Sequence, residues 1–458
     1  MDLFERSELE EAIDRLHDAT AFYTAEPVVE QLLNMVNWPA DGRRLVDSSC
    51  GDGAFLVAAL SRLLTQRPEI GAEEIPKLMK GWEIHYLAAD QARSRLAAQL
   101  RGHGFSEAQA SEAAGRIVVH ADFLKNGPDT QTWDVVAGNP PFCRYAHLPE
   151  VLRLEYERLL PDFAQGDMLH SFLDRCARTL KPGGELAVVT SDRWLFSMGA
   201  AHLREVIGKR LSISHLERLD CTSAFYRPKN RRAGQPPRIH PVAVVLRERG
   251  EDYTPLTREP IYPEADDRAY EGCRPLEAVA NVRLAPWLGP HGIFVVDAHV
   301  ARRLPAELLV PVVDTDNIKG GVLSASTKFA IRTAKDRQPC EAVMKHLDAN
   351  LHLMPKSKQR KDRRWLPPES FERMALDVPS LLIPRIAASL RPVRLPPRVL
   401  PIDHGISIVT AGEASLEAIE EQLLSKEAQD WVKARAPRLE NGYLDLRTTM
   451  LRKLPVRL

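Results

Sequence analysis

The chain has 458 residues, of which 44% are hydrophobic and 27% are charged, as in soluble globular proteins of two or three domains. It has no stretch of 18 or more apolar residues, and its first 16 residues, MDLFERSELEEAIDRL, are acidic and amphipathic. We therefore expect a cytoplasmic protein with no membrane span and no secretory signal. The six cysteines are scattered singly without a C-x-x-C pair, so we expect neither a metal site nor a disulfide framework.

The net charge of zero hides an uneven distribution of charge along the chain. Residues 281–458 contain 28 basic and 20 acidic side chains, whereas the rest of the chain contains 34 and 42. The C-terminal part is thus +8 and the part before it is −8. This asymmetry favours a polyanionic partner for the C-terminal part, and a solvated basic surface is the alternative.

Short apolar runs alternate with helical patterns from about residue 26 to residue 246. This alternation predicts an α/β fold with a doubly wound, mostly parallel sheet. The runs are RRLVDSS at 43–49, MKGWEI at 79–84, GRIVVHAD at 115–122, WDVVAGN at 133–139, GELAVVTS at 184–191 and HPVAVVLRE at 240–248.

The composition changes after residue 249. Residues 250–280 are rich in proline, acidic residues and turn formers, which is typical of a linker or excursion. Shorter apolar runs with many prolines follow, and then one predicted helix over 415–436. We therefore expect an α/β domain at 1–249, a linker at 250–280 and a mixed α+β domain at 281–458.

The first predicted strand leads into LVDSSCGDGAF, where Asp47 is followed by Gly51 and Gly53. Glycines between a strand and a helix let the backbone approach a ligand closely. A dinucleotide-binding loop would have a third glycine where this chain has Leu56, and Asp47 and Asp52 would repel a pyrophosphate. The pattern therefore favours a cationic or zwitterionic ligand.

The next two predicted strands also end in acidic residues. Glu83 lies where doubly wound folds place the carboxylate that binds ribose hydroxyls, and a solvated strand-end acid is the alternative. Asp122 and Phe123 end the third strand; the carboxylate could accept from an adenine amine while Phe123 or Ile84 packs on the ring. Carboxyl ends of parallel strands share one edge of a sheet, so these residues predict a ligand site there.

The fourth strand ends in DVVAGNPPF, residues 134–142. Pro140 and Pro141 hold the chain extended and lack backbone donors, which leaves carbonyl oxygens free to accept hydrogen bonds beside one amide, Asn139, and one ring, Phe142. An ordinary proline-rich turn after a strand is the alternative interpretation.

These motifs, together with Thr24 in FYTAEP, resemble the amino-methyltransferases of DNA that use S-adenosylmethionine. The order, with the cofactor motifs first, is similar to that of the gamma class, which includes the TaqI-type and Eco57I-type adenine methyltransferases. The resemblance covers residues 20–245 well and the C-terminal domain loosely. Two positions depart from it, since Ala25 and Ser48 stand where family members usually or often have proline.

The resemblance implies a Rossmann-like catalytic domain, a C-terminal target-recognition domain, and site-specific methylation of adenine in double-stranded DNA by S-adenosylmethionine without a metal. S-adenosylhomocysteine is the implied product. The amide oxygen of Asn139 and the carbonyl oxygen of Pro140 would accept the hydrogens of the exocyclic amine, with Pro141 and Phe142 completing the motif. Phe142 and Phe225 would stack on the extruded base. The implied cofactor-binding residues are Thr24, Asp47, Cys50, Gly51, Gly53, Phe55, Glu83, Ile84, Asp122, Phe123 and Asn139.

Two basic runs are candidates for phosphate contacts. The first, YRPKNRRAGQPPRIH at 226–240, has no acidic residue, and the second, PKSKQRKDRRW at 355–365, has a flexible solvated run as its alternative. The candidate DNA-binding residues are Arg227, Lys229, Arg231, Arg232, Lys356, Lys358, Arg360, Lys361, Arg363 and Arg364.

Three other functions remain open. Asn-Pro-Pro-aromatic motifs also occur in methyltransferases of release-factor glutamine and of RNA amines, and a catalytically silent nucleic-acid-binding module could keep the fold. A fused nuclease is not expected, because no P-D block followed by E-x-K occurs; a cognate endonuclease would be encoded separately.

Overall fold

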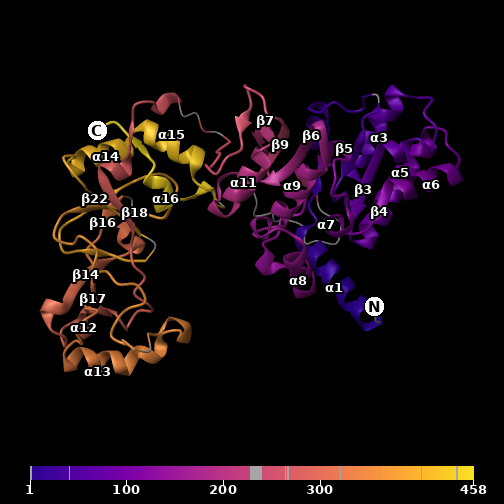
Figure 1. Cartoon of the computed structure of the whole chain (residues 1–458). Helices are drawn as coiled ribbons and strands as arrows, with labels where there is room; N and C mark the ends of the chain where they lie inside the picture. The colour runs from indigo at the N-terminus through magenta and orange to yellow at the C-terminus, as the bar shows by residue number, and fades with distance from the viewer. Residues whose placement is uncertain are drawn as a thin grey trace. The chain divides into compact units, whose positions relative to one another are not determined.

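The computed structural model describes residues 3–40, 42–226, 240–263, 265, 268–319, 321–360, 362–403, 405–439 and 442–458. The chain divides into two compact units, Met1–Pro263 and Glu264–Leu458 (Figure 1). The division falls inside the segment 250–280. Its start is part of the first unit, where β10 joins the main sheet, and its end is part of the second, where β11 and β12 begin.

An eight-stranded sheet forms the centre of the first unit. Its strand order is β10-β7-β9-β6-β5-β2-β3-β4, and the five strands from β6 to β4 are parallel, whereas β9 runs antiparallel to both β6 and β7. The predicted doubly wound, mostly parallel sheet is confirmed, and all six apolar runs contain strands. The strands are β2 (Leu45–Asp47), β3 (Met79–Glu83), β4 (Val118–His120), β5 (Trp133–Gly138), β6 (Leu180–Ser191), β7 (Leu211–Arg218), β9 (Pro241–Glu248) and β10 (Thr254–Pro255).

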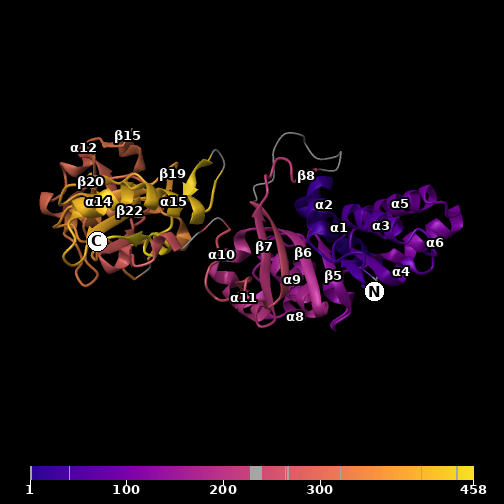
Figure 2. The same cartoon turned by 90° about the horizontal axis from the view of Figure 1, so that it is seen from above.

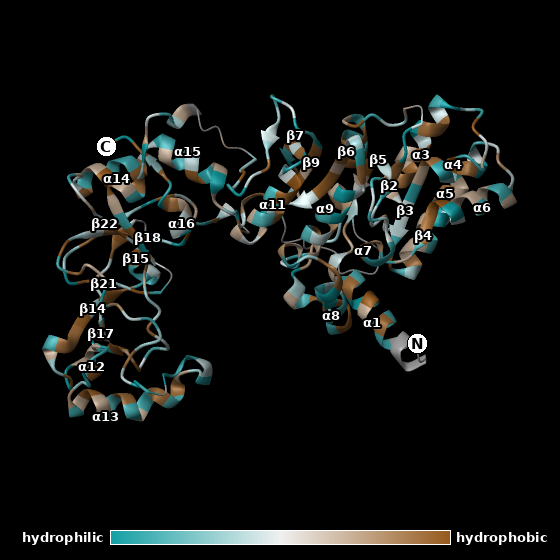
Figure 3. Ribbon diagram, viewed as in Figure 1, coloured by the Kyte–Doolittle hydropathy of each residue, from teal (hydrophilic) through white to brown (hydrophobic). Residues whose placement is uncertain are grey.

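Helices cover both faces of this sheet (Figure 2). Because successive strand residues point to opposite faces, Val135 and Ala137 pack with α2, α3, α5 and α6, whereas Val136 packs with α1, α8, α9 and α11. The hydropathy colouring shows the apolar strands β6 and β9 between amphipathic helices (Figure 3). The helices are α1 (Leu3–Thr20), α2 (Glu26–Asn34), α3 (Ala54–Gln66), α4 (Ile75–Leu78), α5 (Tyr86–Gly102), α6 (Glu107–Ile117), α7 (Phe123–Asn126), α8 (Glu150–Leu159), α9 (Met168–Thr179), α10 (Arg193–Phe196) and α11 (Ala201–Gly208).

The second unit contains two four-stranded sheets, each with its own core. One has the order β12-β22-β18-β20 and packs with α14, α15 and α16; the other has the order β13-β17-β14-β21 and packs with α12 and α13. The elements are β12 (Ala280–Leu284), β13 (Val295–Asp297), α12 (Ala298–Ala301), β14 (Leu309–Val313), β17 (Lys328–Ile331), α13 (Glu341–Asn350), β18 (Ser380–Pro384), β20 (Val393–Leu395), β21 (Leu400–Pro401), β22 (Gly405–Thr410) and α16 (Thr448–Leu451). Three short ladders join β11 (Arg274–Pro275) to β24 (Pro455–Val456), β15 (Ile318–Lys319) to β16 (Val322–Leu323), and β19 (Ile386–Ala387) to β23 (Leu444–Asp445).

The prediction of one helix over 415–436 is wrong, because the segment forms two, α14 (Leu416–Leu424) and α15 (Lys426–Arg435). Ser425 between them has an extended backbone, and its side chain accepts a hydrogen bond from the backbone N–H of Ala428. A serine that caps a new helix in this way ends the preceding one.

None of the described helices is long and apolar enough to cross a membrane. The described residues also include no group of three or more His, Cys, Asp or Glu side chains that could hold a metal ion.

Candidate active site

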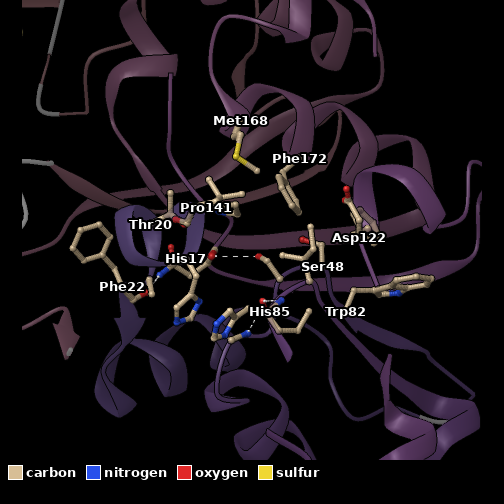
Figure 4. Close-up of a pocket in the computed structure, with 18 of the residues that line it drawn as sticks. His17, Thr20, Phe22, Ser48, Trp82, His85, Asp122, Pro141, Met168 and Phe172 are labelled. Carbon is tan, nitrogen blue, oxygen red and sulfur yellow. Dashed lines mark hydrogen bonds between the residues drawn. The ribbon is translucent and has the colours of Figure 1, made fainter. Parts of the chain in front are cut away.

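A pocket opens at the carboxyl ends of β2, β3, β4 and β5 in the first unit. Helix α1 and the start of α9 supply its remaining walls. In Figure 4, Met168 and Phe172 of α9 reach in from one side, and His17 of α1 and His85 lie on the other. The pocket thus lies where parallel α/β sheets bind ligands.

The loop between β2 and α3 follows the pocket floor because two glycines allow its backbone conformation. Gly51 and Gly53 have φ values of +54° and +87°, in the left-handed region. A Cβ on Gly51 would lie 2.9 Å from the ring of Tyr23, and one on Gly53 would lie 3.0 Å from the Cβ of Ala92. Both positions therefore require glycine for conformation and for space.

Two predicted carboxylates line the pocket and are fixed by hydrogen bonds. Glu83 accepts from the backbone N–H of Gly51 and of His85, both at 2.8 Å. Asp122 accepts from its helix, α7, and from the hydroxyl of Tyr156 at 2.9 Å. Glu83 thereby joins the end of β3 to the glycine loop.

Asp47 lies directly behind the pocket wall. A Cβ on Gly138 would overlap its Oδ1, and the same oxygen accepts from the N–H of Ser49, which lines the pocket. Burial raises the pKa of Asp47 to about 8, and repulsion by Glu83 and Asp52 adds to this rise. Burial also raises the pKa of Glu83. The site therefore concentrates acidic groups whose ionisation a bound cation would favour.

The side-chain amide of Asn139 has a defined orientation. One of its atoms lies 2.7 Å from the backbone carbonyl oxygen of Phe22. Because a carbonyl oxygen can only accept, that atom is the donor Nδ2, and Oδ1 points elsewhere. Oδ1 is buried and has no hydrogen-bond partner among the described residues. A buried amide oxygen without a donor can serve as an acceptor for a ligand.

A short ladder of two strands contains two further predicted residues, Thr24 and Phe225. Strand β1 (Tyr23–Thr24) pairs antiparallel with β8 (Phe225–Tyr226), which places Thr24 opposite Phe225. The Oγ1 of Thr24 is buried without a partner in the described chain. The ring of Phe225 lies 6.0 Å from that of Phe22, the residue that holds Asn139. The ladder therefore brings Phe225 close to Phe22, whose carbonyl oxygen orients Asn139.

The structure brings some of the predicted site residues to the pocket and places others around it. Asp47, Gly53 and Thr24 lie behind the lining, Cys50 and Phe55 belong to the core beneath it, and Pro140, Phe142 and Phe225 are not among the lining residues. Those that line it are Gly51, Glu83, Ile84, Asp122, Phe123, Asn139 and Pro141.

Several lining residues were not predicted. The rings of His17 and His85 stack at 3.8 Å, and Asp14 of α1 lies 3.2 Å from Nε2 of His85. The amphipathic pattern of residues 1–16 was the one available signal for α1. The other unpredicted lining residues are Leu16, Thr20, Ala21, Phe22, Tyr23, Ser48, Ser49, Trp82, Ala121, Tyr156, Met168 and Phe172.

The candidate DNA-binding residues fall into two groups. Arg227, Lys229, Arg231, Arg232 and Lys361 lie outside the described residues. In the second unit, Arg364 pairs with Asp348 at 2.7 Å and Arg360 donates to the carbonyl oxygen of Pro368. The exposed basic residues of this run are Lys356, Lys358, Arg360, Arg363 and Arg364.

Comparison with known proteins supports the predicted resemblance. Residues 53–225 match the model of the Eco57I restriction-modification methylase family. The Type II methyltransferase M.XhoI of Xanthomonas vasicola is 25% identical over 95% of this chain and 90% of its own length. The Type II methyltransferase M.BstVI of Geobacillus stearothermophilus is 23% identical over 70% of this chain, which spans 60% of that relative.

A solved structure has a similar fold. The Type IIL restriction-modification enzyme MmeI, solved in complex with DNA, aligns with 98% of this chain and 66% of its own chain, with a TM-score of 0.57 and 13% identity. At this identity the likeness concerns the fold. The predicted resemblance to the Eco57I-type methyltransferases is confirmed for residues 53–225, which lie in the unit with the mostly parallel sheet.

Proposed function

We propose that this chain, whose catalytic part matches the Eco57I restriction-modification methylases, transfers a methyl group from S-adenosylmethionine to the exocyclic amine of an adenine flipped out of duplex DNA. The observation that carries the proposal is the buried Oδ1 of Asn139 beside the pocket, for which the described part of the chain supplies no hydrogen-bond partner. It offers an acceptor where a planar amine would need one. A restriction-modification or related defence system is the proposed setting, with a separately encoded endonuclease and a cytoplasmic location.

The residues that line the pocket offer suitable partners for the ribose, the purine ring and the positive charge of S-adenosylmethionine. Glu83 presents a carboxylate suited to ribose hydroxyls, and Phe123 and Ile84 present apolar surface suited to a purine ring. The buried Asp47 lies directly behind Ser49, where a positively charged ligand would lower its pKa and favour the ionised carboxylate. When bound, the cofactor supplies a methyl group activated by a sulfonium.

Asn139 and Pro140 would activate the target amine. The lone pair of an exocyclic amine is delocalised into the ring, which makes the amine a weak nucleophile. Fixed acceptors for its two hydrogens localise the lone pair on nitrogen and stabilise the positive charge that develops during attack. The hydrogen bond from Nδ2 of Asn139 to Phe22 keeps Oδ1 in place before the base arrives, so little reorganisation is needed.

Product analysis tests this function directly. The protein would be incubated with methyl-labelled cofactor and, in separate reactions, with duplex DNA, RNA or release factor, and the labelled products would be separated after digestion. N6-methyladenine is the expected product. The appearance of N4-methylcytosine instead would show that cytosine, and not adenine, is the target base. Label that appears only in RNA or in release factor would favour those substrates, and no transfer to any of them would favour a silent binding module.

We expect cofactor selectivity to depend on pH through Asp47. Its pKa of about 8 means that the carboxyl is largely protonated at pH 6, and a bound sulfonium favours the ionised form. Binding should therefore release a proton below about pH 8. The affinity for S-adenosylmethionine relative to S-adenosylhomocysteine should rise from pH 6 to about pH 8, by at most about tenfold per unit, and then level off.

Calorimetry with both ligands measures this ratio. S-adenosylhomocysteine has a neutral sulfur but the same amino group, so the titration of that group cancels in the ratio. Asp47→Asn is the matched variant and should give a ratio that does not change with pH. A flat ratio in the unmodified protein would show that Asp47 does not sense the sulfonium.

We expect the exposed basic run of the second unit to bind DNA phosphates. Replacing Lys356, Lys358, Arg360 and Arg363 by glutamine should weaken binding to all sequences alike. It should also reduce the slope of log affinity against log salt by about 0.9 for each phosphate that is no longer neutralised. Arg364 is kept, because it already pairs with Asp348.

A matched variant removes four exposed charges from the first unit, with glutamine at Arg101, Arg116, Arg158 and Lys209. Its salt slope should stay close to that of the parent. Equal slopes for both variants and the parent would mean that the basic run is only solvated.

A further inference from the structure

The ladder of β1 and β8 ends at a hydrogen bond that the proposed chemistry does not use. The hydroxyl of Tyr226 donates to Oδ2 of Asp52 at 2.5 Å. Asp52 lies between Gly51 and Gly53, inside the loop between β2 and α3, and is 4% exposed. Tyr226 of β8 is thus hydrogen-bonded to the centre of the glycine loop between β2 and α3.

Asp52 is itself held firmly. Its Oδ2 also accepts from Arg95 of α5 at 2.6 Å, and Arg95 donates to the backbone oxygen of Asp52 at 3.0 Å. Hydrogen bonds with a charged partner are stronger than neutral ones. The Tyr226 hydroxyl is therefore bonded to a fixed point of the loop, although 40% of the tyrosine is exposed.

The ladder makes a second connection between the same two regions. Tyr23 pairs with Tyr226, and their rings lie 5.7 Å apart. The ring of Tyr23 also lies against Gly51, where a Cβ would be only 2.9 Å away. Both residues of this pair thus contact the glycine loop.

The other pair of the ladder contains Phe225, the predicted stacking residue for the target base. Phe225 precedes Tyr226 and pairs with Thr24, and the N–H of Ala25 donates to the carbonyl oxygen of Ala224 at 2.9 Å. The same segment supplies the Phe22 carbonyl oxygen that orients Asn139. Phe225 and Asn139 are therefore both attached to residues 22–25, which contact the glycine loop.

We propose that Tyr226 is a positioning residue. Its hydrogen bond to Asp52 connects Phe225, the predicted stacking residue for the target base, to the glycine loop between β2 and α3. A cofactor bound in the pocket therefore orders Phe225 for the incoming base. The inference rests on the proposed function and concerns the coupling between its two ligands. Such coupling is reciprocal, so each ligand must raise the affinity for the other by the same factor.

The test uses Tyr226→Phe, which removes the hydroxyl and keeps the ring. S-adenosylhomocysteine affinity is measured with and without duplex DNA, and DNA affinity with and without S-adenosylhomocysteine. The emission of a fluorescent adenine analogue at the target position reports base capture. Tyr226→Phe should bind S-adenosylhomocysteine alone as the parent does and should lower the mutual enhancement about 5-fold or more.

Tyr253→Phe is the matched control. Tyr253 is a half-buried tyrosine of the same unit that follows β9, lies against Gly250 and is not among the residues that line the pocket. Its removal should leave the enhancement unchanged. In the cycle of Tyr226→Phe, Asp52→Asn and the double variant, the double variant should lose no more enhancement than the larger single loss.

Three results would overturn the coupling. The first is equal enhancement in Tyr226→Phe and Tyr253→Phe. The second is a loss of S-adenosylhomocysteine affinity in the absence of DNA that accounts for the whole effect. The third is a parent protein that binds both ligands without mutual enhancement, which leaves the proposed function standing; a parent that binds neither ligand refutes the function itself.

Discussion

Replacing Asn139 by alanine is expected to lower the single-turnover rate of methyl transfer about 100-fold or more while changing cofactor and DNA affinity much less. The buried Oδ1 has no partner in the described chain, so its loss breaks no hydrogen bond of the free protein, and the variant loses only the bond from Nδ2 to the Phe22 carbonyl oxygen. Its contribution comes when the amine develops positive charge. Rapid-quench measurements with saturating enzyme and labelled cofactor separate this step from binding.

Phe142→Ala is the matched comparison, since Phe142 is three residues away and half-buried against the neighbouring core. It should instead lose about 1 to 3 kcal/mol of stacking on the extruded base, seen as a changed signal from a fluorescent adenine analogue. The two variants should therefore fail at different steps. If Asn139→Ala methylates DNA at the parent rate, the asparagine is only the turn residue that ends β5.

Replacing Glu83 by alanine is expected to weaken cofactor binding by about 1 to 3 kcal/mol, or roughly 5- to 150-fold. The variant loses a carboxylate suited to the ribose hydroxyls. It also leaves the N–H groups of Gly51 and His85 without their acceptor, which loosens the loop that borders the pocket. Calorimetry with S-adenosylmethionine measures the loss.

Glu83→Gln separates these two contributions, because its amide keeps one acceptor oxygen and the length of the side chain. It should bind more tightly than Glu83→Ala and more weakly than the parent. Glu112→Ala, on the exposed face of α6, is the control for loss of one negative charge and should bind like the parent. Parent-like affinity in Glu83→Ala would remove Glu83 from the cofactor site.

The parallel core could be predicted because each buried strand appears in the sequence as a continuous apolar run. Strand β7 could not, since LSISHLER mixes polar residues into the run and has a register shift between Ile213 and His215. The break between α14 and α15 depends on the cap that Ser425 forms, and serine within an otherwise helical pattern does not reveal its backbone conformation.

Within the candidate site, the lining residues at strand ends could be predicted because parallel strands align their carboxyl ends. Glu83, Asp122 and Asn139 all line the pocket for this reason. The contribution of α1 could not be predicted, because an amphipathic pattern does not say which surface a helix will cover. The orientation of Asn139 depends on a carbonyl group 117 residues earlier, a relation that only the fold creates.

The bond between Asn139 and Pro140 also affects how the protein ages. Asparagine deamidates spontaneously when the backbone nitrogen of the following residue attacks the side-chain carbonyl carbon, expels ammonia and closes a succinimide ring that water then opens. The nitrogen of Pro140 carries no hydrogen and is already part of a ring, so this route is closed. Deamidation would put a carboxylate oxygen against the Phe22 carbonyl oxygen, where an acceptor now meets a donor. The proline that follows the amide thus closes the succinimide route by which this amide would otherwise be lost during the lifetime of the molecule.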